Sequence, residues 1–496
     1  MPVTGPACAL VALIVGIVVG ERRGAGSAGA VFAAGIAAGA IALLAARAPT
    51  RVRFVAVVLA CGLLGVSCMQ RALHGLERAP MTDAVVARAD VAVVATLVDD
   101  PESTRWSASV PVRVGTWWRD EARAAVRDAG GRRLVARASG HAAIRLGLLE
   151  AGDEVALRGW VAPLSGYDTR ERWRHAIGVI HAREVTAAAR ARSPLARLAN
   201  ASRAVVLAGT VPMAPVERAV VAGFLLGDTR ALPPDVEEQF RAAGMTHLTA
   251  VSGGNVAFVL ALAAPLLHRL RLGGRVVASG AVLVLFGTMT RWEPSVARAI
   301  AMTSIALVAG YLGRPTAGLR ALLLAATVLL VVDPFLLHSV GFLLSCTASL
   351  GIALWAAPIA HRLRGPAWLR EVLAVTAAAQ LGVAPVLVPV FGSLPLVAVP
   401  ANLVAVPLAA PLTMWGIASG VASAATAPVT PAVADVLAVP TVALVRALLA
   451  VADIAARVPV TLDAPALIAA GAVVALLAAL RKARILRRDA SALPPR

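Results

Sequence analysis

The sequence has 496 residues, of which 59% are hydrophobic and only 15% are charged, and its mean hydropathy is +0.78. Soluble domains are roughly half apolar and a quarter charged, so these values exclude a soluble globular protein. The formal net charge of +19 is weak support for a nucleic-acid partner, because positive-inside topology alone demands arginines in short loops and in the tail. The composition therefore predicts a polytopic α-helical membrane protein.

Three apolar segments begin the chain, near residues 7–20, 28–46 and 54–70. The first has no basic residue before it and two more apolar segments follow at once, so we interpret it as a retained span and not as a signal peptide. Residues 1–70 are therefore predicted to form three transmembrane helices. The cysteines lie in or beside predicted spans and give neither a disulfide framework nor a metal-ligand spacing; they are Cys8, Cys61, Cys68 and Cys346.

Residues 71–193 are soluble in character and are rich in short β-type stretches bounded by glycine, proline and charge. The predicted strands are Asp90–Val98, Ser107–Trp117, Arg132–Ala138, Asp153–Val161 and Ile177–Val185. Five short strands predict an inserted small all-β domain, with an OB-like barrel as the leading interpretation. Aromatic residues in this region could stack on the bases of a single strand, although packing in the core is the commoner fate of tryptophan.

Residues 194–244 are predicted to be a helical linker with amphipathic helices, followed by a transmembrane domain at 245–480 and a basic tail at 481–496. Arginines mark the loops that should face the cytoplasm, with an even number of crossings between successive marks. The marked loops contain Arg47, Arg51 and Arg53; Arg269, Arg271 and Arg275; Arg314 and Arg320; and Arg362, Arg364 and Arg370. This pattern predicts about twelve spans, with both termini in the cytoplasm and the β-rich domain outside.

The densest group of polar residues surrounds the start of the fourth predicted span. Unsatisfied polar groups cost several kcal/mol in lipid, so such side chains normally face a bundle interior or a water-filled cavity. We therefore predict that they line a pathway through the membrane; the candidates are Asp228, His247, Thr249, Ser252, Gly253 and Asn255. The Gly253-Gly254 pair would allow close backbone approach or a break in the helix. The alternative is that the hydroxyl groups only bond back to their own helix.

Several motifs of the second half, taken in order, resemble those of the ComEC-type competence channels. They are Gly-Asp-Thr-Arg at 227–230, His-Leu-Thr-Ala-Val-Ser-Gly at 247–253, Ser-Val-Ala-Arg-Ala at 295–299, Asp-Pro at 333–334, Gly-Phe-Leu-Leu-Ser at 341–345 and Ala-Asn-Leu at 401–403. The resemblance adds Arg298, Ser345 and Asn402 to the candidate pathway. Arg298 could contact phosphate or pair with Glu293, and the alternative is that it only reaches to the membrane interface.

Two departures from the family pattern bear on mechanism. Asn255 stands where the common pattern has a second histidine, which removes a titratable group. Many family members also carry a metallo-β-lactamase-like domain, but the eight histidines of this chain lack the clustering that a two-metal hydrolase needs. Since the sole lysine is Lys482, no ATP-binding loop of the Gly-x-x-x-x-Gly-Lys type is present. We therefore expect no enzyme activity, no cofactor and no metal site.

The resemblance implies a channel in the bacterial cell membrane that passes single-stranded DNA into the cytoplasm during natural transformation. The implied partners are single-stranded DNA, membrane lipid, a separate nuclease, a DNA-receptor protein and a cytoplasmic ATP-driven motor. A secondary transporter of a small solute with a site at His247 is the alternative. An intramembrane enzyme built on Asp228, His247 and Ser252 is a third and weaker hypothesis.

Overall fold

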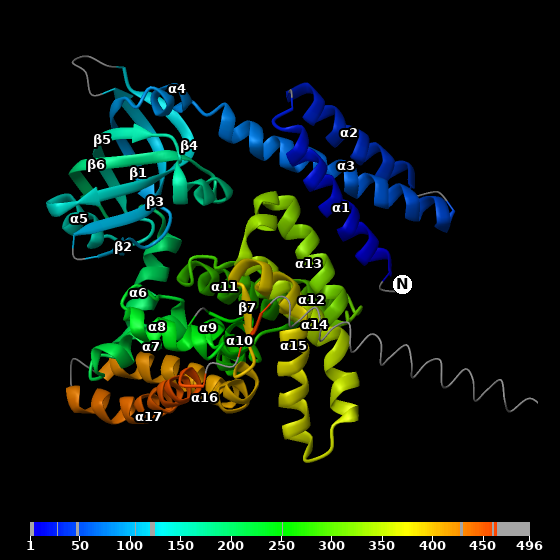
Figure 1. The fold of residues 1–496 in the computed structure, drawn as a ribbon, viewed down its shortest axis with the longest axis vertical. Helices are drawn as coiled ribbons and strands as arrows, with labels where there is room; N and C mark the ends of the chain where they lie inside the picture. Colours follow the sequence, from blue (N-terminus) through cyan, green and yellow to red (C-terminus); the bar gives the residue numbers. More distant parts are fainter. Residues whose placement is uncertain are drawn as a thin grey trace, which may run out of the picture.

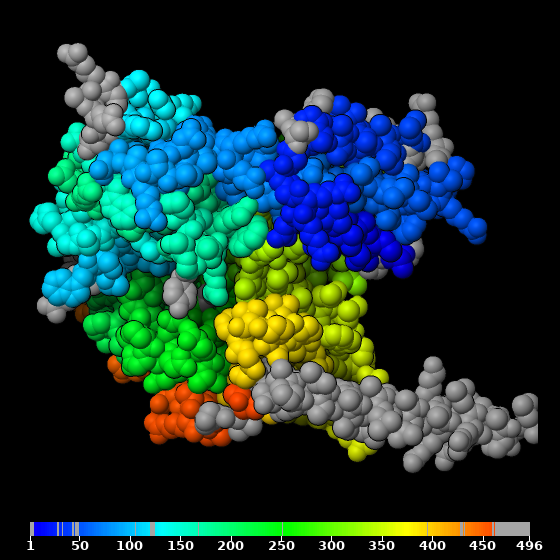
Figure 2. All heavy atoms as spheres, turned by 45° about the horizontal axis from the view of Figure 1, so that its top comes forward, coloured from blue at the N-terminus to red at the C-terminus, as the bar shows by residue number. Residues whose placement is uncertain are grey.

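The computed structural model describes residues 4–463, except residues 27, 46–48, 105, 120–124, 250, 427–429 and 459–460. A β-barrel and three N-terminal helices lie side by side at one end of the molecule, and the other helices lie beneath them (Figures 1 and 2). The predicted tail and the part of the last predicted span after residue 463 lie outside the described residues.

The N-terminal helices are α1 (Thr4–Arg23), α2 (Ala28–Ala45) and α3 (Thr50–Glu77), so the three predicted segments are helical as expected. Helices α1 and α3 cross at very close range. A Cβ atom built on Gly16 would lie only 2.0 Å from the carbonyl oxygen of Gly62, so a larger residue does not fit there. Small residues allow helix backbones to approach in this way inside a membrane. The α1 and α3 pair is therefore fixed by its glycines.

The barrel contains the five predicted strands, at β1 (Asp90–Leu97), β3 (Ser107–Arg119), β4 (Arg127–Ser139), β5 (Glu154–Ala162) and β6 (Ala176–Ala189). The hydrogen-bonded order is β1-β5-β6-β4-β3, and pairing between β1 and β3 closes it. All pairs are antiparallel except β4 with β6. A short strand, β2 (Glu102–Ser103), extends β3, and helix α5 (Gly140–Gly147) connects β4 to β5.

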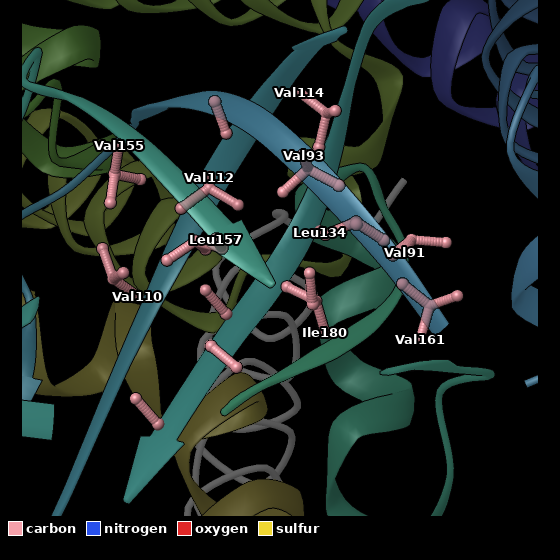
Figure 3. Close-up of a cluster of buried hydrophobic side chains, with 14 of the residues drawn as sticks. Val91, Val93, Val110, Val112, Val114, Leu134, Val155, Leu157, Val161 and Ile180 are labelled. Atoms are coloured by element: carbon pink, nitrogen blue, oxygen red, sulfur yellow. The ribbon is translucent and has the colours of Figure 1, made fainter. Parts of the chain in front are cut away.

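Alternating apolar side chains fill the barrel interior. Val91, Val93, Val110, Val112 and Leu157 point inward and are buried (Figure 3). Since successive side chains of a strand face opposite sides, every second residue of the predicted strands supplies this core. Trp117 is 2% exposed and belongs to the same core, so it is not available for stacking on a base.

The β5–β6 connection attaches the barrel to the helices beneath it. This connection contains the 3-10 helix η1 (Gly166–Arg174) and meets a second 3-10 helix, η2 (Pro334–His338). His175 Nε2 lies 3.0 Å from Asp333 Oδ2, and the Trp173 ring stacks on His338 with centroids 3.8 Å apart. A hydrogen bond and an aromatic stack therefore hold this side of the barrel.

Four short helices follow the barrel, namely α6 (Pro194–Ala208), α7 (Pro215–Leu226), α8 (Pro234–Ala242) and α9 (Thr246–Thr249). Helix α8 coincides with the predicted amphipathic stretch. The helical linker divides into α6 and α7 around Pro212, since proline cannot donate the backbone hydrogen bond that a continuous helix needs there. On the N-terminal side of the barrel, α3 ends seven residues after residue 70, the predicted end of its span, and the short helix α4 (Thr82–Val86) follows it.

The membrane half, defined as residues 245 onward, contains α9, η2 and α10–α17 with one small β-ladder. Its helices are α10 (Gly253–Leu267), α11 (Leu272–Met289), α12 (Pro294–Tyr311), α13 (Gly318–Val332), α14 (Val340–Arg362), α15 (Ala367–Phe391), α16 (Ala398–Thr426) and α17 (Pro431–Ala456). Strand β7 (Ser393–Pro395) pairs with β8 (Thr461–Asp463). Among the described residues, eight helices are long and apolar enough to cross a membrane, and α2, α10 and α13 provide shorter apolar segments.

Candidate functional site: a polar belt at a broken helix

The fourth predicted span is interrupted close to its start. Helix α9 ends at Thr249, and α10 begins at Gly253 with Ser252 as its N-cap residue in an extended conformation. A break exposes the N-terminus of α10, where backbone N–H groups and the helix dipole favour negative charge. The Gly253-Gly254 pair is expected to allow close backbone approach or a break in the helix, and a break lies just before the pair.

Asn255 ties the start of α10 to the end of α7. Its Nδ2 donates to the carbonyl oxygen of Phe224 at 2.9 Å, and its Oδ1 accepts from Ser252 Oγ at 3.2 Å. Asn255 is 2% exposed. Because the last carbonyls of a helix have no partner within the helix, this amide satisfies one of those at the end of α7. Thr249 Oγ1 donates to the carbonyl oxygen of Thr246 at 2.9 Å, so that hydroxyl bonds back to its own helix.

Arg298 is the buried cation of the site. It lies in the first turns of α12 and is 8% exposed. Its Nε donates to Ser345 Oγ on α14 at 2.7 Å and its Nη1 approaches Met302 Sδ at 3.0 Å. A Cβ atom built on Gly253 would lie 2.7 Å from Arg298 Nη2, so only glycine lets the guanidinium sit against the start of α10. We define Ser252, Gly253, Asn255, Arg298 and Ser345 as the polar belt.

No acidic side chain neutralises Arg298 among the residues that the structure describes. Arg298 and Glu293 form no ion pair within that part of the chain, and the Arg298 head group is buried and donates to Ser345 instead of reaching the membrane interface. A buried charge normally requires an opposite charge or dense hydrogen bonding. The arrangement therefore suits a negatively charged ligand beside α10.

Asp228 lies in a different cluster, outside the helices that could span a membrane. Its Oδ2 accepts from Arg203 Nη2 at 2.9 Å and from Arg230 Nη2 at 2.6 Å, and Arg230 Nε donates to its Oδ1 at 2.7 Å. Burial alone would raise the pKa of Asp228, but the hydrogen bonds and charge of Arg230 and the charge of Arg203 outweigh it and lower that pKa. Asp228 is therefore held as a carboxylate in an ion network.

Neither of the last two candidates is hydrogen-bonded to a residue of the polar belt within the described part of the chain. His247 lies on the short helix α9 and its side chain is exposed. Asn402 lies in α16 and is 4% exposed, and its Oδ1 has no hydrogen-bond partner within the described residues. Its buried oxygen is thus free to accept a hydrogen bond from a ligand or water.

Sequence reasoning did not find Arg203, the partner of Asp228, because it lies in the helical linker with no motif around it. Nor did it find that Asp100 of the barrel and Arg291 of the membrane half belong to the same network. Contacts between residues this far apart in sequence leave no local pattern. The only available signal was the placement of Arg291 in a short polar segment between two apolar spans.

Comparison with known proteins identifies relatives of the membrane half. The sequence profile of the Competence protein family matches residues 224–485, just over half of the chain. The chain is also similar to ComE operon protein 3 of Bacillus subtilis (strain 168), with 28% identity over 212 residues, which cover 42% of this chain and 26% of that protein. The alignment thus spans about a quarter of that relative's length. No solved structure matches the chain.

Proposed function

Since the chain belongs to the Competence protein family, we propose that it is a conduit that passes single-stranded DNA across the bacterial cell membrane during natural transformation. Family membership supports a role in DNA uptake during competence. One structural observation supports the proposal of a conduit. The guanidinium of Arg298 is buried beside the start of α10, and no carboxylate pairs with it within the described residues.

A phosphodiester is the anion that fits this environment best. Guanidinium binds phosphate oxygens through paired N–H groups, and the N-terminus of a helix adds backbone donors. Single-stranded DNA presents one such charge per nucleotide, so successive phosphates could exchange at Arg298 as the strand advances. Ser345 and Ser252 supply hydroxyl groups that can replace water around the passing backbone.

We also propose that the barrel is OB-like and lies on the outer face, where it receives the strand. Its closed order of β1, β3, β4, β6 and β5, with helix α5 between β4 and β5, supports that assignment. The arginine map supports about twelve spans with both termini in the cytoplasm. A DNA-receptor protein would deliver the strand to the barrel.

The conduit is proposed to be passive and to have no enzymatic activity of its own. A separate nuclease would then degrade the other strand, and a cytoplasmic ATP-driven motor would pull the strand inward. The chain itself would bind phosphate at the polar belt, and its lipid-facing helices would surround that site.

One observation also favours a secondary transporter of a small anion. Transporters place broken helices at their substrate sites, so that helix ends face the solute, and α9 and α10 form such a break. Uptake of labelled DNA and of a labelled small anion by the same cells separates the two functions, because a transporter would move only the second.

The test of the conduit is uptake of labelled DNA by a deletion strain that expresses Arg298→Gln, compared at equal amounts of folded protein. We expect uptake to fall at least about tenfold, while protein abundance stays within about twofold, because the change removes a buried charge that pairs with no carboxylate within the described residues, and the glutamine amide can still donate to Ser345. Arg275→Gln, which changes a half-buried arginine whose Nη1 lies 3.4 Å from His268 Nδ1, is the control. Normal uptake by Arg298→Gln would remove this residue from the pathway.

A further inference from the structure

Five charged side chains join the barrel to the rest of the molecule at a second point. Asp100, in the β1–β3 connection, accepts from Arg203 Nη2 at 3.0 Å and from Arg291 Nη2 at 2.6 Å. Arg230 Nη2 lies 3.6 Å from Asp100 and 2.6 Å from Asp228, which also binds Arg203. We infer that Asp100, Arg203, Asp228, Arg230 and Arg291 form an ionic clamp that holds the barrel in one fixed position on the membrane half.

The members of the ionic clamp come from four separate segments. They are the β1–β3 connection of the barrel, helix α6, the loop between α7 and α8, and the loop between α11 and α12. Four of the five side chains are largely withdrawn from solvent, with exposed fractions of 6% for Asp100, 8% for Arg203, 9% for Arg291 and 11% for Asp228. Buried ion pairs of this kind add little net stability, but they select one arrangement, since breaking any pair leaves a buried charge without a partner.

The carboxylate of Asp100 is fully hydrogen-bonded. Its Oδ1 accepts from Arg291 Nη2 and from the backbone N–H of Ala151 at 2.9 Å, and its Oδ2 accepts from Arg203 and from Arg291 Nε at 3.2 Å. Burial opposes the charged form most, but the hydrogen bond from Arg291 and the charges of Arg203 and Arg291 together lower the pKa of Asp100. Asp100 is therefore held as a carboxylate at neutral pH.

The backbone at Arg291 provides an independent sign that this position is held by its contacts. Arg291 and Trp292 have φ angles of 55° and 56°, in the left-handed region that residues other than glycine adopt at a cost. Strained backbone of this kind persists where the surrounding structure fixes it. Arg203 supports the same segment, because its Nη1 donates to the carbonyl oxygen of Met289 at 2.6 Å.

The ionic clamp also lies next to the polar belt. A Cβ atom built on Gly227, beside Asp228, would lie 3.1 Å from the Val251 side chain and 3.7 Å from Glu293. Val251 directly precedes Ser252, the N-cap of α10. Docking of the barrel therefore fixes the loop that contacts the broken helix, so Asp228 is assigned as a positioning residue for the pathway.

The experiment measures how fast a buried cysteine reacts when the clamp is altered. Ala151 is 5% exposed, and its carbonyl oxygen accepts from Asn200 of α6 at 3.1 Å. Ala151→Cys is introduced into the full chain after the four native cysteines are replaced by alanine, and the purified protein in lipid nanodiscs is treated with a soluble maleimide. Docking predicts slow labelling that does not change with NaCl concentration, because buried pairs are poorly screened.

We expect Asp100→Asn and Arg291→Gln each to raise the labelling rate at least about tenfold, since each breaks a buried ion pair. The double variant should label no more than about twofold faster than the faster single variant, because the two side chains act through one contact. Arg230→Gln should have a smaller effect, as Arg230 is 34% exposed. Labelling of Asp100→Asn at the parental rate, or single effects that multiply in the double variant, would overturn the clamp.

Two controls separate loss of docking from loss of folding and from loss of function. Arg183→Gln removes an exposed ion pair with Asp90 on the barrel and should leave the labelling rate unchanged. Far-ultraviolet circular dichroism of each variant should keep the parental spectrum, which shows that the helical secondary structure is retained. Docking of the barrel does not depend on the proposed function. Of these tests, only the measurement of DNA uptake rests on the proposed function. Asp228→Asn should lower DNA uptake and raise labelling together, and faster labelling with normal uptake would reject its positioning role.

Discussion

Two carboxyl groups lie beside the ionic clamp, at the junction between the barrel and the membrane half. Glu293 directly precedes α12, and Asp99 directly precedes Asp100 in the β1–β3 connection. Burial raises the pKa of both groups, and the charge of Asp99 adds to the increase at Glu293. Folding therefore favours the protonated form of each, in contrast to Asp100.

Glu293→Gln should make the protein more stable at neutral pH than at acidic pH, relative to the parental chain. A carboxyl group with a raised folded pKa contributes stability below its unfolded value of 4.5 and loses that contribution as the pH rises through the folded value. Glutamine stays neutral throughout. We expect the variant's melting temperature to exceed the parental one by about 2 °C at pH 7, with no gain at pH 4. Glu237→Gln, at an exposed ion pair with Arg241, is the control; equal effects of both variants would contradict the assignment.

His247 offers a second residue-level prediction. Because its side chain is exposed on α9, His247→Leu should leave membrane insertion and protein abundance near normal. If His247 presents hydrogen-bond donors to a hydrated strand, the same change should lower DNA uptake per folded molecule at least about tenfold. A residue that matters only for packing would instead lose abundance in proportion to uptake, at a cost of ~1–3 kcal/mol. His268→Leu is the comparison, and equal uptake by both variants would remove His247 from the pathway.

At the scale of single elements, the break between α9 and α10 is what brings the polar belt together. A continuous helix would satisfy its own backbone N–H groups and would leave no free donors beside Arg298 at the start of α10. The break works only because Gly253 leaves room for the guanidinium. The functional geometry of α10 therefore depends on one missing side chain.

Gly253→Ala should displace Arg298 without unfolding the bundle. The new methyl group would lie 2.7 Å from Arg298 Nη2, the far end of a flexible side chain, and 3.2 Å from Ala299 Cβ. We expect DNA uptake per folded molecule to fall about tenfold or more, while abundance stays near parental. Gly254→Ala is the matched control, because the atom nearest to its new methyl group, Ser252 Oγ, would lie at an ordinary 3.4 Å. The two variants should differ clearly in uptake, and the same uptake in both would reject the role of Gly253.

The sequence predicted elements whose own periodicity or length identifies them. The alternating valines of β1 and β3 and the long apolar stretches of α1 and α3 all lie where expected. Helix α5 was missed, because its eight residues lie between two strands and carry Gly140 and Gly147 at their ends. The motifs identified Gly253, Arg298 and Ser345, but only the fold shows that they meet, because their contacts join α10, α12 and α14.

At the scale of the whole molecule, the barrel and the helices differ in where their apolar side chains lie. The barrel keeps its valines inside a closed core (Figure 3). In the helical half, large apolar side chains remain exposed on helix surfaces, for example Val277 at 74%, Val332 at 69% and Leu266 at 67%. Water would not tolerate so much exposed apolar surface, whereas lipid would cover it. The barrel therefore suits an aqueous compartment and the helices suit a bilayer.

The side of the membrane on which the barrel lies is tested by cysteine labelling in intact cells. Ser139 is exposed at the end of β4, and Ala317 is exposed in the loop marked by Arg314 and Arg320. In a chain without native cysteines, Ser139→Cys should react with a membrane-impermeant maleimide before lysis, because the arginine map places the barrel outside. Ala317→Cys should react only after lysis, because the same rule places its loop in the cytoplasm. The reverse pattern would invert the whole arrangement, and with it the direction in which a strand would meet first the barrel and then the polar belt.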